Sequence, residues 1–194
     1  MAEASTFHDA RSGAPVASPL LAPPHGGPGI SIRERALASL VQVAVWPERS
    51  DALDAALLDA GLPARPGAGR SHEAGGVVAM DGGPGRTLFE GPSDLPARLA
   101  ALVPGEVGTV TDLGHSRVRF SLEGARARWV LAKGTSVDLR DASFPVGAVA
   151  WTTIHGMGVI VRRSSDETFD AMPYRGFARA FAGWLEEAAR PDGR

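Results

Sequence analysis

The chain of 194 residues contains no cysteine. This absence excludes disulfide bonds, thiolate nucleophiles, iron–sulfur ligation and most structural zinc sites. Acidic and basic residues nearly cancel, with 22 against 20, and the formal charge of -2 gives no reason to expect a nucleic-acid partner. No run of about 18 apolar residues is present, and the N-terminus lacks the pattern of a secretory signal. We therefore expect no membrane span and a cytoplasmic location.

The first 29 residues differ in composition from the rest of the chain. They are rich in Pro, Gly, Ala and Ser and show almost no hydrophobic periodicity. Such a composition buries too little apolar surface to offset the entropy of ordering, so we predict a disordered N-terminal tail over 1–29. Its short apolar patch, Ser18–Leu21, would become ordered only on a partner.

The stretch 111–134 contains a complete strand, turn and helix pattern. Apolar and polar residues alternate over 116–123, which predicts a strand with one buried face. Gly124 interrupts the alternation, and apolar residues then recur at helical spacing over 125–133. Gly134 follows, and glycine can take the left-handed conformation that ends a helix.

The same criteria predict the remaining elements. Strands are expected near 30–33 and at 40–46, 77–80, 87–89, 107–111, 148–154, 159–162 and 168–172. Helices are expected at 51–60 with Ser50 as the N-cap, after Ser93, and at the C-terminus; 63–76 is expected to be a loop. One face of the last helix would carry Tyr174, Phe177, Ala178, Phe181, Trp184, Leu185 and Ala188.

These elements repeat in similar order in the two halves of the chain. The expected fold class is α+β, with two plait-like (ferredoxin-like) lobes. We place the first lobe at 30–105 and the second at 106–190.

Candidate catalytic groups are few. Asp112, His115 and Ser116 suggest a Ser/His/Asp triad, but neighbours along a strand point to opposite faces and no G-x-S-x-G motif is present. Glu186 and Glu187 are more simply explained as a solvated helix face than as an acid/base pair. The sequence therefore predicts no catalytic residue.

Binding motifs are equally scarce. The glycine-rich segments 82–85 and 156–158 match neither phosphate-binding pattern and are expected to be hairpin turns. The histidines lack metal-ligand spacing; they are His8, His25, His72, His115 and His155. We predict no cofactor-binding or metal-binding residue. The pairs Arg117/Arg119 and Arg162/Arg163 fit a basic interaction face and solvated strand edges equally well.

Several segments of the second half keep the order and spacing of one known family. They are 110–118 (VTDLGHSRV), 122–128 (LEGARAR), 130–134 (VLAKG), 137–139 (VDL), 144–147 (FPVG), 159–163 (VIVRR), 168–170 (TFD) and 183–186 (GWLE). Together they resemble the gamma subunit of heterotetrameric sarcosine oxidase over about 107–189. The resemblance is looser over 30–103 and includes Ser18–Leu20.

This resemblance implies a fold related to the folate-binding domain of the glycine cleavage T protein. It also implies alpha, beta and delta subunits as partners, which hold NAD, FAD, FMN and the tetrahydrofolate site. Such complexes oxidise the N-methyl group of sarcosine to give glycine, hydrogen peroxide and formaldehyde or methylenetetrahydrofolate. This chain would then be a non-catalytic subunit with no cofactor of its own, and its N-terminal tail would order against a larger subunit.

Alternatives stay open because the sequence departs from the family in three places. Thr135 stands where relatives often have cysteine, Trp151 with the following Thr152-Thr153 stands where smaller or amide residues are usual, and the tryptophan expected soon after Gly91-Pro92 is missing. A paralogous complex that oxidises N-methylglutamate or dimethylglycine is one alternative. A free-standing folate-binding protein is another, although only Lys133-Gly134 remains of its K-G-C-Y-x-G-Q-E motif. A small-molecule-sensing plait domain that regulates an enzyme is the third.

Large apolar side chains at the surface are candidates for subunit contact. Trp46, Phe144 and Trp151 are the residues that we consider for this role. Packing in a core is the competing explanation for each of them.

Overall fold

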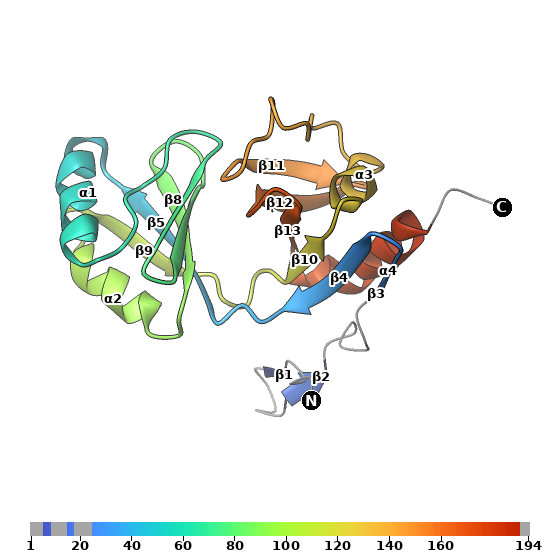
Figure 1. Cartoon of the computed structure of the whole chain (residues 1–194). Coiled ribbons are helices and arrows are strands. Elements are labelled where there is room, and N and C mark those ends of the chain that lie inside the picture. The colour runs from blue at the N-terminus through green and yellow to red at the C-terminus, as the bar shows by residue number, and fades with distance from the viewer. Residues whose placement is uncertain (1–5, 9–14, 18–24, 191–194) are drawn as a thin grey trace. The chain divides into compact units, whose positions relative to one another are not determined.

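The computed structural model describes residues 6–8, 15–17 and 25–190 and divides them into two units (Figure 1). Unit 1 contains the described residues up to Ala36, together with Arg117–Val146 and 151–190. Unit 2 contains Leu37–Ser116 and Gly147–Ala150. The chain therefore leaves unit 1 after its first strands, builds most of unit 2, and returns.

Unit 2 is a five-stranded antiparallel sheet in the order β6-β7-β8-β5-β9. Its strands are Ser39–Val45 (β5), Ser71–Ala74 (β6), Val77–Asp81 (β7), Arg86–Gly91 (β8) and Gly108–Asp112 (β9). A 3-10 turn, Pro47–Arg49 (η1), leads into the helix Ser50–Asp59 (α1), and Leu95–Leu102 (α2) is the second helix. Both helices lie on one side of the sheet (Figure 1) and bury leucines against its valines and Phe89, which forms the core of this unit.

Unit 1 contains a six-stranded sheet in the order β11-β12-β13-β10-β4-β3. Its strands are His25–Gly27 (β3), Ile30–Arg35 (β4), Arg119–Glu123 (β10), Val149–Ile154 (β11), Met157–Arg163 (β12) and Thr168–Pro173 (β13). Its helical segments are Ala127–Ala132 (α3), Arg175–Phe177 (η2, a 3-10 turn) and Ala178–Ala189 (α4). The α4 residue Phe181 lies with its ring centroid 5.6 Å from that of Phe120 in β10, so α4 covers the sheet. None of the described helices is long and apolar enough to cross a membrane.

The predicted α+β class is confirmed, but the lobe boundaries are different. Strand β4, predicted to start the first lobe, pairs with β10 in unit 1, with Ile32 opposite Leu122. Residues 106–116 belong to unit 2 rather than to the second lobe. Apolar alternation indicates which face of a strand is buried, but it does not indicate which sheet the strand joins. The predicted lobes 30–105 and 106–190 are therefore corrected to the two interleaved units.

The predicted disordered tail is also wrong where the structure describes it. His25–Gly27 pairs with β4 as the edge strand of the unit 1 sheet, and Thr6–His8 (β1) pairs with Pro15–Ala17 (β2). Backbone hydrogen bonds to a neighbouring strand need no apolar side chains, so composition alone misses such strands. The patch Ser18–Leu21 lies outside the described residues.

Local details differ at the helix starts and in one loop. Ser50 is the first residue of α1 rather than its N-cap, and Asp94 rather than Ser93 precedes α2. The expected loop 63–76 contains β6, which pairs with β7. Regular α4 begins only at Ala178, so Tyr174 and Phe177 are exposed instead of sharing its buried face.

Gly134 permits close packing between the end of α3 and α4. Its φ is not positive, so the predicted left-handed helix end is wrong. A Cβ built on Gly134 would lie 2.5 Å from Trp184 Cζ2 and 2.8 Å from Ile154 Cγ2. The residue must therefore be glycine because the indole ring occupies the space of a side chain.

Glu34 is a buried carboxylate on the same face of β4 as Ile30 and Ile32. The residue is 8% exposed, and neither carboxylate oxygen has a hydrogen-bond partner among the described residues. Burial raises its pKa to about 7, and attraction to the Arg175 guanidinium only partly opposes this shift. Glu34 is thus an ionisable group that unit 1 carries at a cost in stability.

We predict that Gly134→Ala destabilises the chain by about 1 to 3 kcal/mol, because the new methyl group displaces Trp184. Urea unfolding of the full chain measures this effect. Gly183→Ala is the matched control, since a Cβ at Gly183 in α4 meets nothing within 4 Å. That control should be neutral or stabilising by up to about 1 kcal/mol. Equal stability of the two variants would contradict the packing role of Gly134.

We also predict that Glu34 makes stability fall as the pH rises. The folded state holds the proton up to pH about 7, whereas the unfolded state releases it near 4.5, so stability decreases between these values. The loss should be about 2 to 3 kcal/mol relative to Glu34→Gln, measured by urea unfolding at pH 5 and pH 8. Glu187→Gln, which changes an exposed carboxylate of α4, should keep the wild-type pH dependence. If wild type and Glu34→Gln lose the same stability, the pKa of Glu34 is not raised.

Candidate functional site

Unit 1 contains a pocket of about 600 Å³ beside α3 and the turn between β12 and β13. Apolar Trp129, Ala132 and Phe169 line it together with charged Arg128, Asp141, Arg163, Asp166 and Glu167. Residues with such mixed chemistry make this pocket the first place to examine for binding or catalysis.

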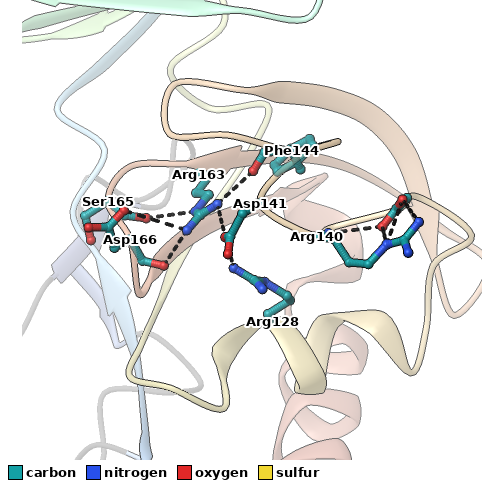
Figure 2. Close-up of polar contacts among 8 residues, drawn as sticks. Arg128, Arg140, Asp141, Phe144, Arg163, Ser165 and Asp166 are labelled. Atoms are coloured by element: carbon teal, nitrogen blue, oxygen red, sulfur yellow. Dashed lines mark hydrogen bonds and ion pairs between the residues drawn. The ribbon is translucent and has the colours of Figure 1, made fainter.

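Arg163, at the end of β12, organises the charged side of the pocket (Figure 2). Its guanidinium donates to the backbone oxygens of Phe144, Ser165 and Asp166, at 3.0, 3.2 and 2.8 Å. Its Nη1 also lies 2.6 Å from Asp141 Oδ1, and Arg128 pairs with the same carboxylate. The side chain is 4% exposed, so this arginine is committed to holding the 141–146 and 164–166 segments.

Two carboxylates of the loop beside the pocket, Asp138 and Asp141, are held ionised. The hydrogen bond from Arg163 lowers the pKa of Asp141, and Arg128 lowers it further. In the same loop, Arg140 donates to both oxygens of Asp138 and lowers the pKa of that carboxyl strongly. These groups are therefore ion-pair partners rather than proton donors at neutral pH.

The arginine pair Arg162 and Arg163 does not form a solvated basic face. Strand alternation places Arg162 on the opposite face of β12 from Arg163, and both are buried. Arg162 Nη1 lies 3.9 Å from Asp170 Oδ2 in β13, and burial raises the pKa of Asp170 against the opposing effects of Arg119 and Arg162. Both expectations for Arg162/Arg163, an interaction face and a solvated strand edge, are wrong.

Arg117 is also buried, just before β10. Its Nη1 donates to the Met172 backbone oxygen at 2.7 Å, and its guanidinium lies 4.0 Å from the Tyr174 ring and 5.1 Å from the Trp151 ring. Burial is the main cause that lowers its pKa, and Tyr174 acts in the opposite direction. This cluster joins a charge to two exposed aromatic rings.

The triad candidates lie in one tight turn of unit 2. Ser116 Oγ donates to the Leu113 backbone oxygen at 2.7 Å, and Asp112 Oδ1 accepts from the Gly114 N–H at 2.8 Å. The hydroxyl and the carboxylate are thus used to hold the turn, and His115 lies between them in the sequence. Glu186 and Glu187 lie on α4, partly buried and exposed respectively.

The remaining motif candidates belong to different units. His72 Nδ1 lies 3.3 Å from the Ala64 backbone oxygen in unit 2, whereas the His155 ring stacks on Trp184 in unit 1. The described residues contain no group of three or more His, Asp or Glu placed to hold a metal ion. The segment 82–85 forms the β7–β8 turn, as predicted, whereas of 156–158 only Gly156 lies in the β11–β12 turn and residues 157 and 158 begin β12.

The three proposed contact residues differ in their exposure to solvent. Trp151 is 46% exposed, and Trp46 is 43% exposed with its indole N–H donating to the Gly105 backbone oxygen. Phe144 is buried and stacks on Phe169, so it is a core residue and not a contact residue.

Two features were missed at the level of sequence. Glu34 continues the alternation of Ile30 and Ile32 and so falls on the buried face of the strand. This spacing could have predicted a buried carboxylate. Thr135 is one departure from the family, and Thr152, which follows Trp151, belongs to the second. Their hydroxyl oxygens lie 3.1 Å apart. Pairwise contact between distant sequence departures cannot be read from a single sequence.

Comparisons with known proteins identify relatives of this chain. The sequence model of the "Sarcosine oxidase, gamma subunit family" matches residues 98–191. A sarcosine oxidase subunit gamma from Arthrobacter sp. is 32% identical over 164 residues, covering 82% of this chain and 79% of that protein. The subunit gamma from Corynebacterium sp. (strain P-1) is 30% identical over 162 residues, with the same coverage.

Comparison with solved structures agrees with the sequence comparison. A chain of heterotetrameric sarcosine oxidase from Corynebacterium sp. U-96, solved with pyrrole 2-carboxylate, superposes with a TM-score of 0.76 and 25% identity, covering 88% of this chain and 91% of that one. The glycine cleavage system aminomethyltransferase T from Bartonella henselae shares the fold, with a TM-score of 0.60, 20% identity and coverage of 94% and 54%. The sequence and structure comparisons agree, and this chain belongs to the sarcosine oxidase gamma subunit family.

Proposed function

We propose that this chain is the gamma subunit of a cytoplasmic heterotetrameric sarcosine oxidase. In that role it supports the oxidative demethylation of sarcosine to glycine, with hydrogen peroxide and formaldehyde or methylenetetrahydrofolate as the other products. The observation that carries the proposal is 32% identity to a sarcosine oxidase subunit gamma across 82% of the chain. The fold shared with a chain of the heterotetrameric enzyme supports it.

The proposed contribution of the chain is structural, and the reaction takes place in the alpha, beta and delta subunits. Those partners would hold FAD, FMN, NAD and tetrahydrofolate, and the flavins would accept the electrons from sarcosine. The polar groups described above are consistent with this division. The Ser116 hydroxyl donates a hydrogen bond to a backbone carbonyl oxygen, and Arg163 and Asp141 neutralise one another beside the pocket.

A subunit without chemistry of its own acts by changing the stability or geometry of its neighbours. Binding to the folded partners stabilises the assembled form by mass action. The expected consequence of removing this chain is therefore loss of complex or of activity, although the reacting groups all remain.

We predict that the full chain, co-expressed with the other oxidase subunits, co-purifies in a fixed stoichiometry and that the assembly produces hydrogen peroxide from sarcosine. Gel filtration and a peroxide assay measure the two parts. Omitting the chain should reduce assembly, turnover or both, because a stabilising contact is lost. A chain that does not co-purify, and whose omission changes neither assembly nor turnover, would contradict the proposal.

The same preparation distinguishes the alternatives. N-methylglutamate and dimethylglycine replace sarcosine in the peroxide assay, and a higher kcat/KM for either would identify a paralogous complex. Titration of the isolated chain with tetrahydrofolate tests the free-standing folate-binding alternative, for which tight binding is required.

A further inference from the structure

Exposed aromatic side chains gather at one place in unit 1. Trp151 in β11 and Tyr174 and Phe177 after β13 are 46%, 47% and 49% exposed. They are three of the six large hydrophobic side chains that are exposed among the described residues. We refer to these three residues and Arg117 as the aromatic patch. Exposed apolar groups that cluster, rather than scatter, are typical of interaction sites.

Arg117 joins two of the three rings of the patch. Its guanidinium contacts the rings of both Tyr174 and Trp151, which therefore lie against the same side chain. The residue is 4% exposed and anchored by its bond to the Met172 backbone oxygen. The backbone of residue 117 pairs with that of Tyr174 and accepts a hydrogen bond from Arg175 Nη2.

The Tyr174 ring and the backbone turn that follows it are held before any partner arrives. The Tyr174 ring lies over Gly158, where a Cβ would already be 3.4 Å from Tyr174 Cε2. The Phe177 N–H donates to the Tyr174 backbone oxygen at 2.9 Å, which fixes the turn between the two rings. Ordered side chains lose little entropy on binding, so such a surface is suited to tight association.

The charge of the patch indicates the chemistry of its partner. Within the described residues Arg117 contacts the Met172 backbone oxygen, the rings of Trp151 and Tyr174, and the Tyr174 hydroxyl, and none of these is a carboxylate. The neighbouring Arg175 adds positive charge, and the carboxylate of Glu34 that attracts it is buried. An acidic side chain from outside would supply the missing counter-charge in a desolvated place.

We propose that the aromatic patch is the surface through which this chain docks on another subunit of the oxidase, and that the docked surface presents an Asp or Glu carboxylate to Arg117 within an apolar surround. This inference rests on the proposed function. Trp, Tyr and Arg are the residue types that contribute most of the energy at protein interfaces.

A second copy of the chain is a poorer occupant. Symmetric pairing would place the same patch on both sides, so Arg117 and Arg175 would face their own copies. Like charges in a desolvated contact oppose association, and the exposed part of the patch contributes no carboxylate of its own. The partner must therefore bring the acid.

The test measures binding of the full-length chain to the oxidase assembly purified without it, by biolayer interferometry. Trp151→Ala and Tyr174→Ala should each raise Kd at least tenfold. Trp46→Ala, which removes an equally exposed tryptophan of unit 2, should stay within twofold of wild type. Trp151→Phe and Tyr174→Phe should bind nearly as wild type, and thermal unfolding of the free chains confirms that each variant folds.

Variants of Arg117 test whether the partner presents a carboxylate to the patch. Arg117→Leu should raise Kd at least tenfold, because it removes the positive charge that the partner's carboxylate would contact, and thermal unfolding of the free variant shows whether it folds. Arg117→Gln, which can still donate to the Met172 backbone oxygen, is the second variant if Arg117→Leu does not fold. Binding of the folded Arg117 variants at wild-type strength would overturn the acidic occupant.

The outcomes separate this inference from the proposed function. If the wild-type chain does not bind the assembly, the proposed function fails. If the wild type binds and Trp151→Ala and Tyr174→Ala bind equally well, only the aromatic patch is overturned. Analytical ultracentrifugation of the free chain tests whether a second copy occupies the patch. A dimer that Trp151→Ala dissociates would overturn the assignment to another subunit.

Discussion

The pairing of β4 with β10 is the constraint on which unit 1 depends. It joins residues 31–35 to 119–123, with all of β5 to β9 between them in the sequence. Closing a loop of roughly 80 residues costs on the order of 4 kcal/mol when the loop is unstructured. Unit 2 removes much of this cost, because β5 and β9 are neighbours and the Leu113 N–H bonds the Leu40 backbone oxygen. Folding of unit 2 therefore brings together the two ends from which β4 and β10 extend.

The arginines of unit 1 divide into two kinds according to what neutralises them. Arg163 is surrounded by backbone oxygens and two carboxylates, and Arg162 faces Asp170 across neighbouring strands. Such arginines fix loops and strands, and breaking one pair would leave a buried charge behind. Arg117 is equally buried but contacts rings and one carbonyl. The hydrogen bond and the two rings offset part of the cost of burying this charge, but no carboxylate of the described part of unit 1 neutralises it, which is consistent with a residue retained for binding.

Sequence periodicity predicted most strands and the α+β class because alternation and helical spacing are local signals. It failed where the deciding contact is distant in sequence. Gly134 was assigned to a helix end, yet Trp184 of α4 is what requires it. Arg162 looked solvent-exposed beside Arg163, although Asp170 lies opposite it. The candidate site was harder still, because no motif indicates that residues 117, 151 and 174 meet.

The 3-10 turn before α4 determines which aromatic residues of this segment are buried. Helical spacing from 174 onward would place Tyr174 and Phe177 on the face of Phe181, which is buried against Phe120. Instead Tyr174 is extended and paired with Arg117, and the i to i+3 bond of Phe177 closes a separate turn. The turn thus changes which side chains face the sheet, so that Tyr174 and Phe177 are exposed and Phe181 lies in the core. A single uninterrupted helix with the same side chains would have buried the surface that a partner can use.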